Sequence, residues 1–440
     1  MVNFNPPLTI HHSQVTMKVF FRRIHLYLSF AAGLVILVAC LTGALLVFEK
    51  DIQMATSKER YYVAPGGTPL STADLLQRVK DSFPDAKING VKWYAAADRS
   101  VEVSVAFPKK KEGAGNAARK DSGNAVVKTE AGPKAGGKET PKAGAKPERQ
   151  PGFTIFVNPY TGVILEKYSY RETSFYTVFA LHRWLLGGED SVGKLIVGIS
   201  TLLFLFILIT GIVLWWPRTR KIMQQRLSIK WGASWKRVNH DLHLVLGFYS
   251  ALFLFVFAFT GLAWSFEWFN KGIYTVTGSP EKAPPPPKSA YALEATAQKP
   301  AVNYDGVLQQ ARALHAGATF YNVQTPKDAT DPVTVQLLPK DAVHESATHA
   351  LYFDRYTGAS LGDLAWKERS LGARVRGTFK PVHTGSIWGL PSKIIAFIVC
   401  LFGVTFPITG TIMWWNRTRK KKARKAGKPV PVDDVEEELA

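Results

Sequence analysis

The sequence predicts a membrane protein that is mainly α-helical. The predicted fold is a four-helix transmembrane bundle built as a tandem parallel repeat, with two α+β domains outside the membrane. Three observations predict this class: four long apolar runs, near-copies among those runs, and two soluble stretches with strand-like alternation. At about 1.5 Å per residue, each run is long enough to cross a hydrocarbon core of about 30 Å. The runs cover residues 24–48, 195–216, 242–266 and 394–415.

The first and third apolar runs align without a gap. Residues 24–49 read IHLYLSFAAGLVILVACLTGALLVFE, and residues 242–267 read LHLVLGFYSALFLFVFAFTGLAWSFE. His25 aligns with His243, and a Thr-Gly pair follows each histidine at the same spacing. An ionisable side chain in a membrane helix is costly and usually functional. The repeated histidine is therefore the first candidate site residue.

The second and fourth runs also match each other. ILITGIVLWWPRTRK at 207–221 corresponds to TFPITGTIMWWNRTRK at 405–420. A histidine lies upstream of each, His182 in ALHRWLLGG and His383 in PVHTGSIWG. Because each half begins on the same side of the membrane, the two repeats are parallel rather than inverted.

The formal net charge of +21 is concentrated beside the membrane ends and in one soluble stretch. This distribution argues against a nucleic-acid partner and for a lipid bilayer. The positive-inside rule places both termini and the middle loop in the cytoplasm. The membrane-flanking basic residues are Lys18, Arg22, Arg23, Arg218, Arg220, Lys221, Arg226, Lys236, Arg237, Arg417, Arg419, Lys420, Lys421 and Lys422.

The predicted organisation follows from these runs and charges. It comprises a cytoplasmic arm (1–20), a first helix (21–49), an outer α+β domain (50–174), a histidine segment (175–190), a second helix (191–216), a cytoplasmic loop (217–237), a third helix (238–268), a second outer α+β domain (269–375), a second histidine segment (376–390), a fourth helix (391–415) and a cytoplasmic tail (416–440).

The two outer segments share one pattern of predicted elements. Each has a helix followed by short alternating strands and a turn that contains Tyr-Thr-Gly. Residues 109–150 are rich in Lys, Gly, Ala and Pro, and are expected to be a disordered insertion. The expected helices cover 72–83 and 304–315; the expected strands cover 90–95, 101–107, 153–157, 163–167, 318–324, 333–338 and 350–353.

Topology sorts four histidines into two pairs. His25 and His243 begin outward-going helices, so they are expected near the cytoplasmic face; His182 and His383 precede inward-going helices, so they are expected near the outer face. Two imidazoles at one depth of an apolar bundle suit the two axial positions of a haem. Zinc or copper would need more ligands, and no Cys, Asp or Glu accompanies these histidines in the apolar runs.

Several alternatives accompany this interpretation. Each histidine could instead be an ordinary interfacial residue, and His240, three residues before His243, is a reserve ligand candidate. Each Thr-Gly glycine is expected either to clear room for a porphyrin held by the other histidine pair or to serve ordinary helix packing. These glycines are Gly43, Gly211, Gly261 and Gly410.

Residues 22–49, the HRW…ITGIVLWWPRTRK stretch and the two Tyr-Thr-Gly domains together resemble the PepSY-associated transmembrane helix family. This family includes iron-regulated inner-membrane proteins and ferric-siderophore reductases of Gram-negative bacteria. The resemblance covers nearly the whole chain except residues 1–20, 109–150 and the tail after residue 425.

The resemblance implies a multi-pass inner-membrane protein with periplasmic PepSY-like domains. It implies two haem b groups and an oxidoreductase that reduces a ferric siderophore or another Fe(III) chelate and releases Fe(II). The haem ligands that it implies are His25, His182, His243 and His383.

No flavin or nicotinamide fingerprint is present, so the electron donor is expected to be another molecule, such as a flavoprotein or quinol. Two other functions remain as alternatives. One is a haem electron conduit for a different redox partner. The other is a non-redox membrane protein whose PepSY-like domains bind or inhibit a peptidase.

Overall fold

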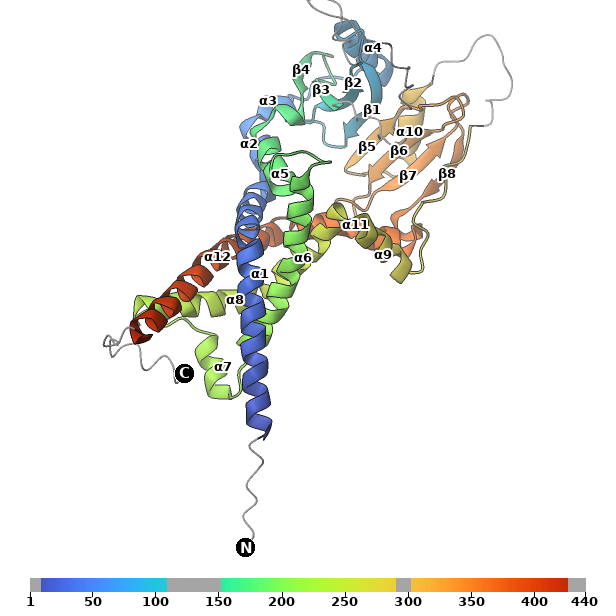
Figure 1. The fold of residues 1–440 in the computed structure, drawn as a ribbon. Coiled ribbons are helices and arrows are strands. Elements are labelled where there is room, and N and C mark those ends of the chain that lie inside the picture. Colours follow the sequence, from blue (N-terminus) through green and yellow to red (C-terminus); the bar gives the residue numbers. More distant parts are fainter. Residues whose placement is uncertain (1–8, 109–151, 290–301, 426–440) are drawn as a thin grey trace, which may run out of the picture.

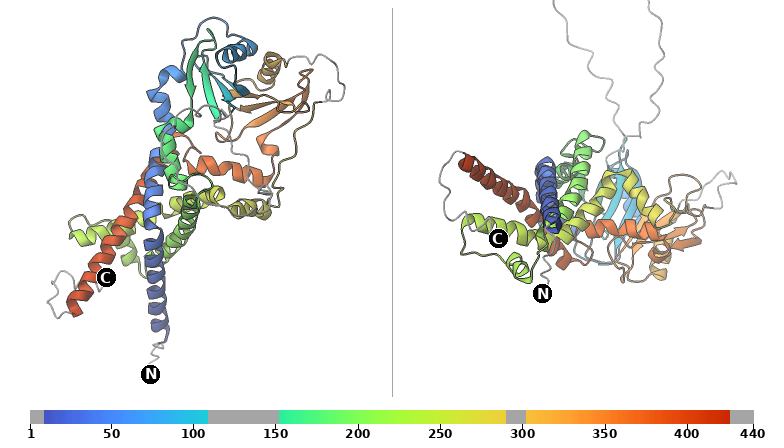
Figure 2. Two further views of the ribbon diagram at one scale, coloured as in Figure 1. Left: turned by 45° about the horizontal axis from the view of Figure 1, so that its top comes forward. Right: turned by 60° about the horizontal axis from the view of Figure 1, so that its bottom comes forward.

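The computed structural model describes residues 9–108, 152–289 and 302–425. An eight-stranded sheet and its helices lie at one end of four long helices (Figure 1 and the left view of Figure 2). We call this end sheet-proximal and the opposite end sheet-distal. Each long helix contains a stretch that is long and apolar enough to cross a membrane. The long helices are α1 (Thr9–Val47), α6 (Val192–Trp215), α8 (Trp235–Ser265) and α12 (Leu390–Lys425).

The start of α1 and the end of α12 both lie at the sheet-distal end, as does the short helix α7 (Arg220–Arg226) (Figure 1). α1 begins at Thr9, so helix extends through much of the stretch 1–20 that the sequence analysis assigned to a polar arm. The predicted insertion at 109–150 lies outside the described residues.

α1 and α8 each pack against both α6 and α12, which places α1 and α8 across a diagonal of the bundle. Small residues allow close approach of α1 and α12: a Cβ added at Gly403 would lie 2.5 Å from the Sγ of Cys40. In lipid, such close packing replaces the hydrophobic effect as the force that holds helices together. The buried residues between the helices include Ala32, Ile36, Cys40, Phe204, Leu205, Leu208, Leu254, Ala258, Leu262 and Val399.

The segments that connect α1 to α6 and α8 to α12 have matching elements in matching order. Apart from α3 (Lys58–Tyr61), which has no counterpart among the described residues of the second segment, each has a short helix after the long one, a helix and four strands, a 3₁₀ turn, and a helix that carries a histidine. The helical elements are α2 (Glu49–Thr56), α3 (Lys58–Tyr61), α4 (Thr72–Ser82), η1 (Tyr170–Glu172) and α5 (Ser174–Trp184) in the first segment, and α9 (Glu267–Val276), α10 (Tyr304–Leu314), η3 (Trp366–Glu368) and α11 (Leu371–His383) in the second.

The strands of both segments form one antiparallel sheet in the order β4-β3-β2-β1-β5-β6-β7-β8. At its centre β1 pairs with β5, with Val91 opposite Val323 and Trp93 opposite Tyr321. The strands are β1 (Lys87–Tyr94), β2 (Val101–Ala106), β3 (Gly152–Val157), β4 (Ile164–Tyr168), β5 (Phe320–Gln324), β6 (Val333–Leu338), β7 (His349–Phe353) and β8 (Ser360–Leu364).

The sequence predicts two outer α+β domains, and the structure shows that the strands of both belong to a single sheet. The β1–β5 pairing joins the two units into one sheet, and one hydrophobic cluster extends through both. The physical reason is that β1 and β5 would each be an exposed edge of a four-stranded sheet, and an unpaired edge is prone to pair with another strand. The helices and strands expected in the two outer segments agree with the structure within a few residues, but β8 and the helices α2, α3, α5, α9 and α11 were not predicted.

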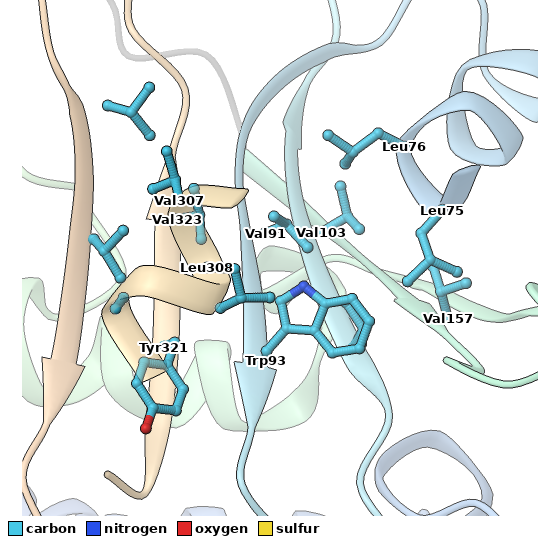
Figure 3. Close-up of a cluster of buried hydrophobic side chains, with 14 of the residues drawn as sticks. Leu75, Leu76, Val91, Trp93, Val103, Val157, Val307, Leu308, Tyr321 and Val323 are labelled. Atoms are coloured by element: carbon cyan, nitrogen blue, oxygen red, sulfur yellow. The ribbon is translucent and has the colours of Figure 1, made fainter. Parts of the chain in front are cut away.

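Helices α4 and α10 pack on one face of the joined sheet. Their buried side chains, including Leu75 and Val307, contact the inward-facing residues of the central strands (Figure 3). The carboxylate of Asp305 in α10 accepts a hydrogen bond of 2.6 Å from the backbone N–H of Thr72 in α4. One helix thus satisfies an orphan backbone donor at the start of the other, which fixes the two segments relative to each other.

The β1–β5 junction depends on a glycine. A Cβ at Gly90 would lie 2.8 Å from the carbonyl oxygen of Val323, whereas a Cβ at Gly152 in β3 would meet nothing within 4 Å. We therefore expect Gly90→Ala to lower the free energy of unfolding by about 1–3 kcal/mol, the usual cost of overpacking. Gly152→Ala is the matched control. The measurement is the thermal unfolding midpoint of the full chain in detergent; equal midpoints for the two variants would contradict the prediction.

Candidate functional site

His25 of α1 and His243 of α8 face each other across the bundle diagonal near its sheet-distal end. Their ring centres lie 6.5 Å apart, and the ring planes are inclined by 86°. The structure pairs His25 with His243 rather than with the reserve candidate His240. The Nδ1 of His240 instead lies 3.6 Å from a carboxylate oxygen of Asp241.

His182 and His383 form a second pair at the sheet-proximal end. His182 lies near the end of α5, and His383 is the last residue of α11. Their ring centres lie 6.2 Å apart with an interplanar angle of 65°. The four histidines singled out in the sequence are thus brought together in two pairs, one at each end of the bundle, and each pair takes one residue from each half of the chain.

Each histidine is held by a Thr-Gly pair of a neighbouring long helix. The Nδ1 of His25, for example, lies 3.0 Å from Thr210 Oγ1 and 3.1 Å from the carbonyl oxygen of Ile207. The remaining contacts are His182 Nδ1 with Thr42 Oγ1 (3.0 Å) and the Ala39 carbonyl (3.0 Å), His243 Nδ1 with Thr409 Oγ1 (2.8 Å), and His383 Nδ1 with Thr260 Oγ1 (3.1 Å) and the Phe257 carbonyl (2.9 Å).

These contacts determine which ring nitrogen carries the proton. A carbonyl oxygen can only accept, so an imidazole that bonds one must donate from Nδ1. No carbonyl oxygen of the described residues lies at hydrogen-bond distance from His243 Nδ1, but the hydroxyl of Thr409 already donates to the carbonyl of Thr405 at 2.9 Å and therefore accepts from the ring. In all four histidines the proton is thus on Nδ1. The Nε2 lone pair is left available as a metal ligand.

The glycine of each Thr-Gly pair lies against the histidine ring itself. The first atom that a Cβ would meet is the ring carbon between the two nitrogens (Cε1) in every case. Each glycine thus leaves room for the imidazole of the histidine pair at its own level of the bundle. The distances are 3.3 Å at Gly211 for His25, 3.4 Å at Gly43 for His182, 3.5 Å at Gly410 for His243 and 3.2 Å at Gly261 for His383.

The threonines belong to the candidate site through their contacts with the imidazoles, whereas the sequence alone suggested a role only for the glycine that follows each. The signal was present, because a threonine precedes that glycine in all four long helices. Its own hydroxyl proton is bonded within its helix, as at Thr210, which donates to Phe206 at 2.8 Å. The threonine can therefore orient an imidazole without leaving a polar group unsatisfied.

The paired imidazoles fit the axial positions of a haem. Two metal–nitrogen bonds of about 2 Å on opposite sides of one ion would place the ring centres roughly 6 Å apart. The observed separations of 6.5 and 6.2 Å agree with this value. In the part of the chain that the structure describes, no group of three or more His, Cys, Asp or Glu side chains is placed to hold a metal ion. A metal held by two imidazoles would need further donors, and a planar macrocycle could supply them.

The sheet-proximal pair is neutral at physiological pH. Burial, together with the neighbouring His383 and Arg183, lowers the pKa of His182 to about 4. Burial likewise lowers the pKa of His383. Neutral imidazole is the form that binds a metal, so desolvation favours the ligating state. Trp264, whose ring centre lies 5.4 Å from that of His383, adds to the apolar surroundings.

The fold is that of a membrane protein with four apolar helices and a sheet module at one end of them. Two histidine pairs lie inside the helix bundle. A family model described as the PepSY-associated TM region matches residues 22–417. The chain therefore belongs to this family, as the sequence analysis expected. No curated protein matches the chain.

The Thr-Gly contacts can be tested by comparing two threonines. Thr409→Val leaves the Nδ1–H of His243 without a partner, which is expected to cost about 1–3 kcal/mol. Thr210→Val is the matched control, because the Nδ1–H of His25 retains the Ile207 carbonyl at 3.1 Å. We expect a larger fall in the thermal midpoint of the purified protein for Thr409→Val. Equal falls would show that the threonine is not what holds His243.

Proposed function

We propose that this chain is an inner-membrane di-haem oxidoreductase of the ferric-siderophore reductase type. In this proposal both termini are cytoplasmic and the sheet module is periplasmic. Electrons enter at the His25–His243 pair, leave at the His182–His383 pair, and reduce a siderophore-bound or otherwise chelated Fe(III), so that Fe(II) is released. The donor is a separate flavoprotein or quinol.

One observation carries the proposal: two facing histidine pairs, with ring centres 6.5 and 6.2 Å apart, lie at opposite ends of an apolar bundle. The distance between the two histidine pairs can be measured along α1, which carries His25 of one pair and, 18 residues later, Gly43. Gly43 lies against the ring of His182 of the other pair. That distance is about 27 Å at about 1.5 Å per helical residue. A pair near each membrane surface is the arrangement that electron transfer across the bilayer requires.

The residues of the chain would hold two haem b groups, one on His25 and His243 and the other on His182 and His383. A haem held there would supply reversible one-electron chemistry, and two imidazole ligands would leave it no coordination position for oxygen or substrate. The threonines fix the direction of each Nε2. Side chains between the two levels, such as Phe204 and Leu254, are buried and keep water out of the bundle.

The matching elements of the two halves support a tandem duplication. Both segments lead from a long helix through a four-stranded part of the sheet to a histidine helix. The Tyr-Thr-Gly turns also match: Asn158 Oδ1 accepts from the backbone N–H of Tyr160, and Asp354 Oδ1 accepts from that of Tyr356, both at 2.9 Å. In the proposal, each half is a PepSY-like copy that contributes one ligand to each haem.

The proposed orientation rests on basic residues at the sheet-distal end. The start of α1, the helix α7, the start of α8 and the end of α12 lie there, and these elements with Arg218 before α7 carry the membrane-flanking lysines and arginines (Figure 1). Basic residues next to short loops favour the cytoplasmic side. The sheet module is then periplasmic, on the side where a ferric chelate arrives after crossing the outer membrane.

Reduction is an effective way to release iron from a siderophore. Siderophores bind Fe(III) through hard oxygen donors, and the softer Fe(II) is bound far more weakly by such ligands. One electron delivered to the chelate therefore releases the metal. The sheet-proximal histidine pair lies next to the module where such a chelate would dock.

The haem assignment can be tested on the purified protein by the reduced-minus-oxidised absorbance spectrum and the haem content. We expect a spectrum of six-coordinate haem b and a content near two per chain. In the double variant His182→Ala/His383→Ala the content should fall by about half, because one of two bis-imidazole sites is lost. His240→Ala is the control and should retain the wild-type spectrum. Absence of haem absorbance in the wild type would exclude the redox proposal and favour the peptidase-binding alternative.

The direction and acceptor can be tested by anaerobic reoxidation. Protein reduced with dithionite is mixed with Fe(III) siderophores of different donor type, and the decay of the reduced haem band is followed. We expect rapid reoxidation and formation of Fe(II), and loss of this reaction in His182→Ala/His383→Ala while the remaining haem stays reducible. Reduced wild-type protein that resists every Fe(III) chelate but transfers electrons to another acceptor would instead indicate a conduit for a different partner.

A further inference from the structure

Two arginines from different halves of the chain converge beside the sheet-proximal histidine pair. Arg183 follows His182 in α5, and Arg376 lies two turns before His383 in α11. Both contact Trp264 of α8. A terminal nitrogen of Arg183 donates to the Trp264 carbonyl at 3.3 Å, and the guanidinium carbon of Arg376 lies 4.8 Å from the centre of the Trp264 ring.

Neither guanidinium has a carboxylate partner among the described residues, although both are half-buried. Arg376 donates from Nε to Asn270 Oδ1 at 2.6 Å, and its two terminal nitrogens make no hydrogen bond to the residues that the structure describes. Each guanidinium has five N–H donors in a planar fork, so most donors of the two side chains are unused.

The arrangement is unfavourable without a further negative charge. Both guanidinium groups contact the same residue, Trp264, so two positive charges lie close together in a partly buried place. Two like charges brought together in a partly desolvated place repel each other, and the cost is removed by an anion that both can bind. A carboxylate matches the fork of a guanidinium in a bidentate manner.

We propose that Arg183 and Arg376, with Trp264 between them, form a carboxylate-binding site at the edge of the His182–His383 pair. This inference rests on the proposed function. The carboxylate belongs either to a propionate of the haem held by that pair or to a soluble carboxylate chelate of Fe(III) arriving at the sheet-proximal surface. In both cases the site places a negative group next to the point where electrons leave the protein.

The experiment uses the purified full chain and the variants Arg183→Gln, Arg376→Gln and their double. Arg374→Gln is the matched control, because Arg374 is also half-buried in α11 but lies two residues, or about 200°, around the helix from Arg376. Arg183→Lys and Arg376→Lys keep the positive charge but lose the planar, bidentate donor group of the guanidinium. They control for a general folding defect that loss of a half-buried charge in the glutamine variants could cause.

Two measurements distinguish the sources of the carboxylate. The first is the haem content with the midpoint potential of each haem. The second is calorimetric binding of redox-inert Ga(III)–citrate to the oxidised protein, compared with a Ga(III) trihydroxamate that has no free carboxylate. A haem propionate predicts that the double variant loses one haem or shifts one potential to a lower value, since a positive charge that stabilises the reduced form is gone. A soluble chelate predicts about tenfold weaker binding of Ga(III)–citrate with unchanged trihydroxamate binding and unchanged haem.

The proposal is overturned if the double variant matches Arg374→Gln in haem content, potentials and Ga(III)–citrate binding. That outcome leaves the proposed function intact, because the wild-type haem and its reoxidation are measured separately. Conversely, a wild-type protein without haem defeats the proposed function. In that case Ga(III)–citrate binding alone decides the carboxylate site: arginine-dependent binding supports it, and its absence overturns it.

Discussion

The hydrogen bond from each imidazole Nδ1 to a neighbouring helix is the constraint on which the rest of the site depends. It places the proton on one nitrogen, frees the other, and ties together elements that are distant in the sequence, as His25 and Thr210 are. Because a threonine hydroxyl and, in three cases, a backbone carbonyl accept this bond, the ring cannot rotate without losing a buried hydrogen bond. In this way the orientation of all four imidazole rings, the candidate ligands, is fixed within the helix bundle.

The glycine next to each threonine completes this arrangement. A side chain at Gly261 would begin 3.2 Å from the ring of His383, closer than a comfortable contact. The imidazole therefore lies against the helix backbone, where it can reach the threonine and the carbonyl at once. The threonine and the glycine together set the position, the hydrogen bond and the tautomer of each imidazole. This role explains why the Thr-Gly dipeptide recurs in all four long helices.

The joined sheet links the two halves outside the bundle. Each histidine pair takes one residue from each half, so its geometry depends on how the halves are placed relative to each other. The β1–β5 pairing and the contact of Asp305 with the start of α4 fix that placement at the sheet-proximal end. The convergence of Arg183 and Arg376 on Trp264 is a consequence of the same assembly, since the two arginines come from different halves.

The sequence by itself determined the four apolar helices, most of the strands, the family and the four histidines. It could do so because length, apolar composition and period are local properties, and because the chain contains near-copies of its own segments. Only the tertiary structure decided that the two soluble units form one sheet, since edge pairing between β1 and β5 leaves no local pattern. It also decided that the Thr-Gly pairs hold imidazoles and that Arg183 and Arg376 meet. Those contacts join residues more than 80 positions apart, and their geometry exists only once the helices have packed.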